Sequence, residues 1–268
     1  MDKTAPTNKA TMTTNLRDRC LGHFATLGIP LRPDALDALL VKAEKEGMSH
    51  LGFLDDLIGR LAAERRERSV ARRIREAQFA ESKTLEAFDW DFNAKAINRS
   101  QIEELATCDF IRRRSNLIIV GWSGVGKSHV VQALGLRACA QDYRVLYRTS
   151  AQLISDLTAS LADKTLPERL RWYARPQLLI IDEFGFDRIE RTECPQAAPL
   201  FYKIIASRNQ KSSTALITNV DFDQWGEYLT DGPIAMAFLD RLVEGAILIK
   251  IKGKSYRKKD AKRKEDAS

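Results

Sequence analysis

The sequence predicts an α/β fold, in which helices cover both faces of a parallel sheet, preceded by a small all-α domain. From Asn116 onward, short β-like runs alternate with stretches of helical spacing, an alternation typical of a parallel sheet. One of these runs, "LLII", is continuously apolar, as expected for a strand that is buried on both faces. Residues 16–80 show only helical patterns, which indicates a separate helical domain.

Three helices are expected in residues 16–80. An apolar stripe at helical spacing runs through "LRDRCLGHFATLGI" and predicts the first helix. The second begins in "RPDALDALL" and ends at Gly47, a candidate C-cap. The third extends from the candidate N-cap Ser49 through "SHLGFLDDLIGRLAAERRERSVARRIREAQF".

The third helix concentrates positive charge. Arginines outnumber glutamates between Glu64 and Glu76, which favours contacts with DNA phosphates over a solvated helix face with internal Glu–Arg pairs. The net charge of +7 also favours an acidic partner such as nucleic acid. The candidate DNA contacts in this helix are Arg65, Arg66, Arg72 and Arg73.

The second part of the chain is expected to supply five strands. They are predicted in "NLIIVG", "RVLYRT", "QLLIIDE", "TALITN" and "AILIKIKG". The helices between them are predicted at 128–141, 150–162, 197–208 and 234–243.

The stretch "LIIVGWSGVGKSHVVQALG" joins the first strand to a helix through a glycine-rich turn. Gly121, Gly124, Gly126, Lys127 and Ser128 fit the pattern G-x-x-x-x-G-K-[ST] in the strand-to-helix context that the pattern requires. The glycines let the backbone wrap a polyphosphate, and the helix adds its positive dipole end. The lysine should reach the β- and γ-phosphates, and the serine hydroxyl should ligate Mg²⁺. The turn therefore predicts a site for ATP and Mg²⁺.

Two acids follow the third predicted strand, in "LLIIDE". The strand brings Asp182 to the carboxyl edge of the sheet, where it can orient Mg²⁺. Glu183 is placed to polarise a water against the γ-phosphate. This general base distinguishes an ATPase from a protein that only binds the nucleotide.

Two further polar residues are candidates for catalysis. Asn219 ends the fourth predicted strand and is expected to hold the attacking water, although an asparagine there could also cap the next turn. Arg241 lies on an amphipathic helix, where it would either pair with Asp240 or Glu244 or reach the γ-phosphate of a neighbouring subunit. The second interpretation requires an oligomer.

The motifs, taken in order, resemble those of the IstB-type ATPases, AAA+ helper proteins encoded beside the transposase of certain bacterial insertion sequences. The bacterial helicase loader DnaC is a close relative of this family. The resemblance covers about Leu16 to Arg257. It is carried by the P-loop, "LLIIDEFGF", "SSTALITN", "DQWGEYLTDGPIAMAFLDRL", "IKIKGKSYR" and, upstream, "RRIREAQFAESKTLEAFDWDFN".

The resemblance implies an ATP-dependent homo-oligomer with ATP at its subunit interfaces, which binds duplex DNA and recruits or activates a transposase. Asp182 and Glu183 match Walker B, Asn219 matches sensor 1, and Arg241 matches the arginine finger. The implied nucleotide-binding residues are Gly121, Trp122, Ser123, Gly124, Val125, Gly126, Lys127, Ser128 and His129, with Arg257 as a second sensor.

The chain departs from the family pattern in two places. Trp122 and Ser123 stand where prolines are frequent, and Ser128 stands where threonine is common. Only residues 254–268 follow the last predicted strand, so a full AAA+ lid of several helices is not expected.

In this clade, an extra helical element after the second strand faces DNA, and "DLTASLADKTLPERLRWYARPQ" fills that place. An ordinary solvated helix pair is the alternative. The candidate phosphate contacts in this segment are Lys164, Arg169, Arg171 and Arg175.

Three functions fit these observations. The first is an ATP-dependent transposition helper, which closes around duplex target DNA. The second is a DnaC-like replicative helicase loader, which the helical domain and joining segment favour less. The third is a P-loop kinase for a small molecule, against which the adjacent acids of "LLIIDE" and Arg241 argue.

The expected domain organisation follows from these patterns. The N-terminus lacks the apolar core of a signal peptide, no apolar run reaches membrane-spanning length, and the cysteines are expected to be reduced, so a cytoplasmic protein with no membrane partner is predicted. The expected divisions are a disordered N-terminus (1–15), a helical DNA- or partner-binding domain (16–80), a linker (81–98), the AAA+ ATPase domain (99–253) and a basic C-terminal tail (254–268).

Overall fold

The computed structural model divides the chain into two compact units, Met1–Ser69 and Val70–Ser268. The residues that the structure describes are 9–185, 194, 196–221, 224–225 and 232–256.

The division falls before residue 80, where the sequence places the end of the helical domain. The last turns of the third helix pack with the second unit instead. Ala77 is buried in the core of that unit, and Arg73 forms an ion pair with Asp142 at 2.8 Å. The helix pattern predicts where the helix ends, but not which unit its last turns pack against.

The first unit contains three helices, as predicted. They are α1 (Lys9–Thr26), α2 (Pro33–Glu46) and α3 (His50–Ala77), of which the last continues into the second unit. The two predicted caps are confirmed: Gly47 adopts a left-handed φ of 60° at the end of α2, and the Ser49 hydroxyl accepts a 3.1 Å hydrogen bond from the Gly52 amide. The small core of this unit consists of Leu39, Leu57 and Leu61, with Phe24, Ile29, Leu31 and Phe53 packed against them.

The second unit is built on a sheet of five parallel strands in the order β2-β3-β4-β1-β5. This confirms the predicted α/β class and all five predicted strands. Because every strand runs the same way, the carboxyl ends meet at one edge, where ligands bind in open α/β sheets. The strands are β1 (Leu117–Gly121), β2 (Val145–Thr149), β3 (Leu178–Phe184), β4 (Ser213–Thr218) and β5 (Ile247–Ile251).

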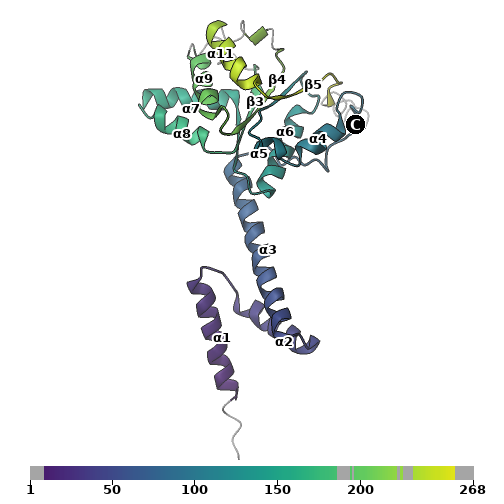
Figure 1. Ribbon diagram of the computed structural model, residues 1–268, viewed down its shortest axis with the longest axis vertical. Coiled ribbons are helices and arrows are strands. Elements are labelled where there is room, and N and C mark those ends of the chain that lie inside the picture. Colours follow the sequence, from purple (N-terminus) through teal and green to yellow (C-terminus); the bar gives the residue numbers. More distant parts are fainter. Residues whose placement is uncertain (1–8, 186–193, 195, 222–223, 226–231, 257–268) are drawn as a thin grey trace, which may run out of the picture. The chain divides into compact units, whose positions relative to one another are not determined.

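Helices cover both faces of the sheet because alternate residues of each strand enter different cores. In β1, Ile119 contributes to one core and Ile118 to the other. In Figure 1, α4, α5 and α6 lie on one side of the strands, and α7, α8, α9 and α11 lie on the other. These helices are α4 (Arg99–Leu105), α5 (Asp109–Arg112), α6 (Lys127–Ala140), α7 (Ser150–Ala162), α8 (Leu166–Ala174), α9 (Ala197–Arg208) and α11 (Gly232–Val243).

The predicted linker, residues 81–98, packs along α6. The Glu81 amide donates a 2.9 Å hydrogen bond to the Gln132 side chain, and the Thr84 carbonyl lies 2.7 Å from His129 Nε2. Phe88 and Trp90 pack against the core on this face of the sheet. The linker is therefore a fixed part of the second unit.

A bulge in β3 shapes the edge that carries the two acids. The pairing of β3 with β4 shifts register between Ile181 and Phe184. Within the bulge, Glu183 adopts a left-handed φ of 59°, a conformation that non-glycine residues adopt at a cost in energy. The Thr218 hydroxyl donates a 2.8 Å hydrogen bond to the Phe184 carbonyl and so fixes the end of the bulge.

All four cysteines are free thiols in the structure. Cys20 is exposed, and the other three are buried. Burial raises the pKa of Cys108 to about 11 and that of Cys139 to about 12, so both are protonated at neutral pH. Among the described residues, none of the helices is both long and apolar enough to span a bilayer.

Candidate nucleotide-binding site

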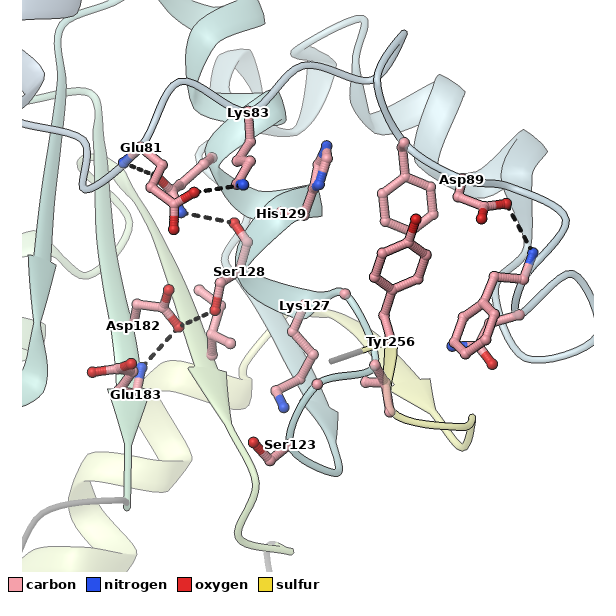
Figure 2. A pocket seen from close by; sticks show the side chains of 18 of the residues that line it. Glu81, Lys83, Asp89, Ser123, Lys127, Ser128, His129, Asp182, Glu183 and Tyr256 are labelled. Carbon is pink, nitrogen blue, oxygen red and sulfur yellow. Dashed lines mark hydrogen bonds and ion pairs between the residues drawn. The ribbon is translucent and has the colours of Figure 1, made fainter. Parts of the chain in front are cut away.

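A cavity of about 570 Å³ opens at the carboxyl edge of the sheet (Figure 2). Its walls come from the glycine-rich turn after β1, the ends of β3 and β4, the linker, and the segment that follows β5. Five parts of the chain therefore meet around one pocket. Residues 123–128 of the predicted phosphate loop and both predicted acids are among its lining residues.

The turn after β1 requires glycine for two separate reasons. Gly124 and Gly126 have φ angles of 79° and 104°, in the region that side chains disfavour. A Cβ on Gly121 would collide with the backbone carbonyl of Ile251 on the neighbouring strand. Gly126 also forms the N-cap of α6, so the curled backbone leads directly into a helix N-terminus. Such an arrangement is suited to binding a polyphosphate.

Lys127 and Ser128 begin α6 and both face the cavity (Figure 2). Lys127 is only 8% exposed, and its ammonium donates hydrogen bonds to the carbonyls of Gly121 at 2.7 Å and Trp122 at 2.8 Å. These contacts hold the positive charge at the mouth of the loop. This is the position from which an ammonium can bind phosphate oxygens.

The two acids of β3 lie beside Ser128. The Ser128 hydroxyl donates a 3.2 Å hydrogen bond to Asp182 Oδ1, which also accepts a 2.8 Å hydrogen bond from the Glu183 amide. Asp182 is buried, whereas the Glu183 side chain is exposed to the cavity. A hydroxyl and a carboxylate side by side form the hard oxygen donor set that Mg²⁺ prefers, so these residues fit the ion.

Asn219 reaches the same cavity from the end of β4. It is exposed and lines the pocket together with Thr218 and Glu183. The strand order places β4 between β1 and β3, so Asn219 lies between the phosphate loop and the acids. This is the position expected of a residue that holds an attacking water.

The other predicted nucleotide-binding residues lie as follows. The Trp122 side chain is 74% exposed, and this residue contributes its backbone carbonyl to Lys127. Val125 is buried in the core, and the His129 ring packs edge-on against Phe88 at 5.0 Å between centroids. Arg257 lies outside the described residues.

The far end of the cavity is aromatic, and the sequence alone does not reveal it. Phe88 and Phe92 come from the linker, and Tyr256 follows β5. The Tyr256 ring meets Phe92 edge-on, with 5.0 Å between centroids. The alternation of aromatic and acidic residues in "FDWDF" shows that rings pack here, but not which of them face the cavity. Aromatic faces of this kind are suited to stacking a nucleotide base.

A second cation also lines the cavity. Lys83 of the linker forms an ion pair with Glu81 at 2.5 Å, and Figure 2 shows both side chains above Ser128. Nothing in the local sequence "ESK" predicts that Lys83 lines the cavity. The pair adds one positive and one negative charge near the acids of β3.

Asn93 joins the linker to the segment after β5. Its side-chain amide donates a 3.0 Å hydrogen bond to the Lys254 carbonyl, and its oxygen accepts a 3.0 Å hydrogen bond from the Lys254 amide. Two residues later, the Tyr256 amide donates to the Gly124 carbonyl at 2.8 Å. The segment after β5 is therefore tied to both the linker and the phosphate loop.

Replacing Asn93 with alanine is expected to weaken ATP binding about thirtyfold, because two hydrogen bonds of about 1 kcal/mol each would be lost from the pocket wall. Isothermal titration with a non-hydrolysable ATP analogue would measure this. Asn98→Ala is the matched control, since Asn98 caps α4 through a 3.2 Å hydrogen bond and does not line the cavity. Equal affinities of Asn93→Ala and the wild type would contradict the role of this wall.

Arg241 does not line the cavity of its own chain. Its guanidinium lies over the Tyr202 ring, 4.9 Å from the centroid, and donates a 3.1 Å hydrogen bond to the Ala237 carbonyl. No ion pair with Asp240 or Glu244 is among the contacts of the described residues. The side chain is half-buried on α11.

The candidate DNA contacts fall into two groups. Most are exposed, but Arg73 is 17% exposed and pairs with Asp142, and Arg169 pairs with Asp156 at 3.3 Å. Arg72 pairs with Glu76 at 3.8 Å and Arg171 with Glu168 at 3.3 Å, so four of the candidate arginines already hold ion pairs within the chain. The exposed candidates are Arg65, Arg66, Arg72, Lys164, Arg171 and Arg175.

Sequence comparison places this arrangement among known proteins. A profile of the IstB-like ATP binding proteins matches residues 10–264. The ATP-binding protein of insertion sequence IS21 from Pseudomonas aeruginosa is 35% identical over 228 residues, which cover 85% of this chain and 84% of that protein. The ATP-binding protein of insertion sequence IS5376 from Geobacillus stearothermophilus is 29% identical over 252 residues, which cover 94% and 98%.

Solved structures show the same fold. The AMPPCP-bound DnaA from Aquifex aeolicus matches with a TM-score of 0.52 and 24% identity, over 71% of this chain and 56% of that chain. DnaI matches with a TM-score of 0.52 and 20% identity, over 63% of this chain and 90% of that chain. The second unit therefore has the P-loop AAA+ fold.

Proposed function

This chain belongs to the family of IstB-like ATP binding proteins, and from that premise we propose that it is an ATP-hydrolysing transposition helper. It assembles on duplex target DNA and recruits or activates the transposase of its insertion sequence. One observation carries the hydrolytic part of this proposal. Glu183 presents an exposed carboxylate to the cavity beside the Ser128–Asp182 pair, where a general base is needed.

Each group of residues around the cavity has a separate role in hydrolysis. Lys127 and the loop amides bind the phosphates, and Ser128 and Asp182 would hold Mg²⁺. When bound, Mg²⁺ supplies positive charge against the phosphate oxygens. Glu183 orients and deprotonates the attacking water, and Asn219 holds that water from the side of β4. The aromatic wall receives the base.

The position of Arg241 supports an oligomer. Its guanidinium lies over the Tyr202 ring. Arg241 is not among the residues that line the cavity of its own chain. An arginine that acts on ATP from this position acts on the ATP of a neighbouring subunit, as arginine fingers supplied in trans do. ATP would then hold adjacent subunits together.

The positive net charge of the chain supports nucleic acid as the binding partner of the assembly. The chain carries a net charge of +7, and exposed basic residues occur on α3, on α8 and on the turn before α8. Binding through such residues releases counterions and is therefore expected to weaken steeply with salt. The insertion-sequence context of the relatives supports a transposase as the protein partner.

Light scattering with ATP and Mg²⁺ tests this proposal. We expect large particles to form on duplex DNA, and neither on single-stranded DNA nor without nucleotide. Lys127→Ala is the control, since it removes the phosphate-binding ammonium and should stay small under every condition.

The other outcomes separate the rival functions. Assembly on single-stranded DNA, together with copurification of a replicative helicase, would instead indicate a helicase loader. Indifference to both kinds of DNA would contradict the proposal and favour phosphate transfer to a small molecule.

A further inference from the structure

Tyr147 contacts the Asp182 carboxylate, and none of the sequence motifs predicts this contact. It lies on β2, is 4% exposed, and its hydroxyl is 2.8 Å from Asp182 Oδ2. Its Cα pairs with Ile180 on β3, so Asp182 is the diagonal neighbour on the same face of the sheet. Only a long side chain reaches across this diagonal.

We propose that Tyr147 is a positioning residue for metal-dependent nucleotide binding. Its hydroxyl fixes the orientation in which the Asp182 carboxylate would hold Mg²⁺. This inference rests on the proposed function, since it takes the cavity to be an ATP and Mg²⁺ site. The residue touches neither nucleotide nor metal and acts through Asp182.

The hydroxyl is the donor in this contact. Tyr147 donates from its phenol O–H to Asp182 Oδ2, in a contact between two buried side chains. An ionised carboxylate can accept hydrogen bonds but cannot donate one. The hydrogen bond therefore runs from tyrosine to aspartate and stabilises the charge that a cation needs.

The two carboxylate oxygens have separate partners. Oδ1 accepts from the Ser128 hydroxyl and the Glu183 amide, and Oδ2 accepts from Tyr147. A carboxylate held at both oxygens cannot rotate without breaking one of these contacts. Residues that hydrogen-bond a ligating group in this way commonly control metal affinity.

The tyrosine ring is itself held in place. It belongs to the core on the α6 face of the sheet, and Phe79 packs on it with 6.2 Å between centroids. Phenylalanine at position 147 would keep these packing contacts and lose only the hydroxyl. Tyr147→Phe therefore isolates the hydrogen bond from the fold.

The test measures binding of a fluorescent ADP analogue to the full-length protein, with no hydrolysis involved. Affinity is determined in excess EDTA and across a Mg²⁺ titration. For Tyr147→Phe, we expect unchanged affinity in EDTA and about a tenfold higher Mg²⁺ concentration for half-maximal enhancement of binding.

Tyr173→Phe is the matched control. Tyr173 is also buried and also donates a 2.8 Å hydrogen bond to an aspartate, Asp156, but neither residue lines the cavity. This variant should keep the Mg²⁺ requirement of the wild type. It measures what the loss of a buried tyrosine–aspartate bond does to the protein in general.

The outcomes are distinguishable. A Mg²⁺ requirement in Tyr147→Phe equal to that of the wild type overturns the inference, as does an equal shift in Tyr173→Phe. A loss of affinity in EDTA that matches the loss in Mg²⁺ also overturns it, because the effect would then concern the pocket as a whole. If the wild type itself shows no Mg²⁺-dependent nucleotide binding, the proposed function fails instead.

Discussion

Glu183→Gln is expected to slow ATP hydrolysis by about 10²–10⁴-fold while ATP still binds, because glutamine keeps the size of the side chain and removes the general base. The side chain is exposed at the cavity, and the backbone of this residue is held by its own contacts. Its carbonyl accepts a 3.2 Å hydrogen bond from the Ser150 hydroxyl, and its amide donates to Asp182. The variant should therefore preserve the bulge.

Single-turnover hydrolysis of labelled ATP, with a parallel binding titration, measures this effect. In the presence of duplex DNA, the variant should also stay assembled, since ATP would persist at the subunit interfaces. Both results follow from one change only if Glu183 acts on the attacking water.

Glu81→Gln is the control for Glu183→Gln. Glu81 is an exposed acid that lines the same cavity, so its loss changes the charge of the pocket by the same amount. Its effect on hydrolysis should be small. An unchanged rate in Glu183→Gln would show that the assigned role is wrong, and equal losses in both variants would attribute the effect to pocket charge.

The positions of the glycine-rich turn and of the acids of β3 could be predicted because their signals are local. Five residues within eight positions define the loop, and a continuous apolar run followed by Asp182 and Glu183 defines the end of the buried strand. The helix predicted at 150–162 matches α7, whose N-cap Thr149 forms a capping box with Gln152. Patterns of this kind require no knowledge of distant residues.

The rest of the pocket could not be predicted, because it depends on contacts between distant segments. Asn93 and Lys254 are 161 positions apart, and each alone is an unremarkable polar residue. From the sequence alone, Tyr147 is an ordinary strand residue. Its contact with Asp182 depends on the pairing of β2 with β3. In each case, the contact arises only from the sheet order and the path of the linker.

Arg208 illustrates the same limit away from the site. At the end of a predicted helix, an arginine is usually solvated, yet this one is 1% exposed. Its guanidinium donates to the carbonyls of Tyr173, Pro176 and Ser213, and burial lowers its pKa to about 9. Only the tertiary structure supplies these acceptors.

Arg241→Ala is expected to reduce hydrolysis by about 10³-fold or more, the usual contribution of an arginine finger. ATP binding by the isolated chain should be unchanged, because Arg241 does not line that chain's cavity. Steady-state hydrolysis at a concentration that supports assembly measures the effect. Arg112→Ala is the control, since Arg112 is an exposed arginine that pairs with Asp109, three residues earlier on the same helix. Full activity in Arg241→Ala would reject the finger.

Mixing two inactive variants decides whether Arg241 acts between subunits. Glu183→Gln subunits keep Arg241, and Arg241→Ala subunits keep Glu183. If the arginine completes the site of a neighbour, some interfaces in the mixture contain both intact residues, and part of the hydrolysis should return. If the arginine acts within its own chain, each subunit lacks one essential group in every pairing, and the mixture should stay inactive at all ratios. Recovery of activity would therefore establish an active site shared between subunits, which no measurement on a single variant can do.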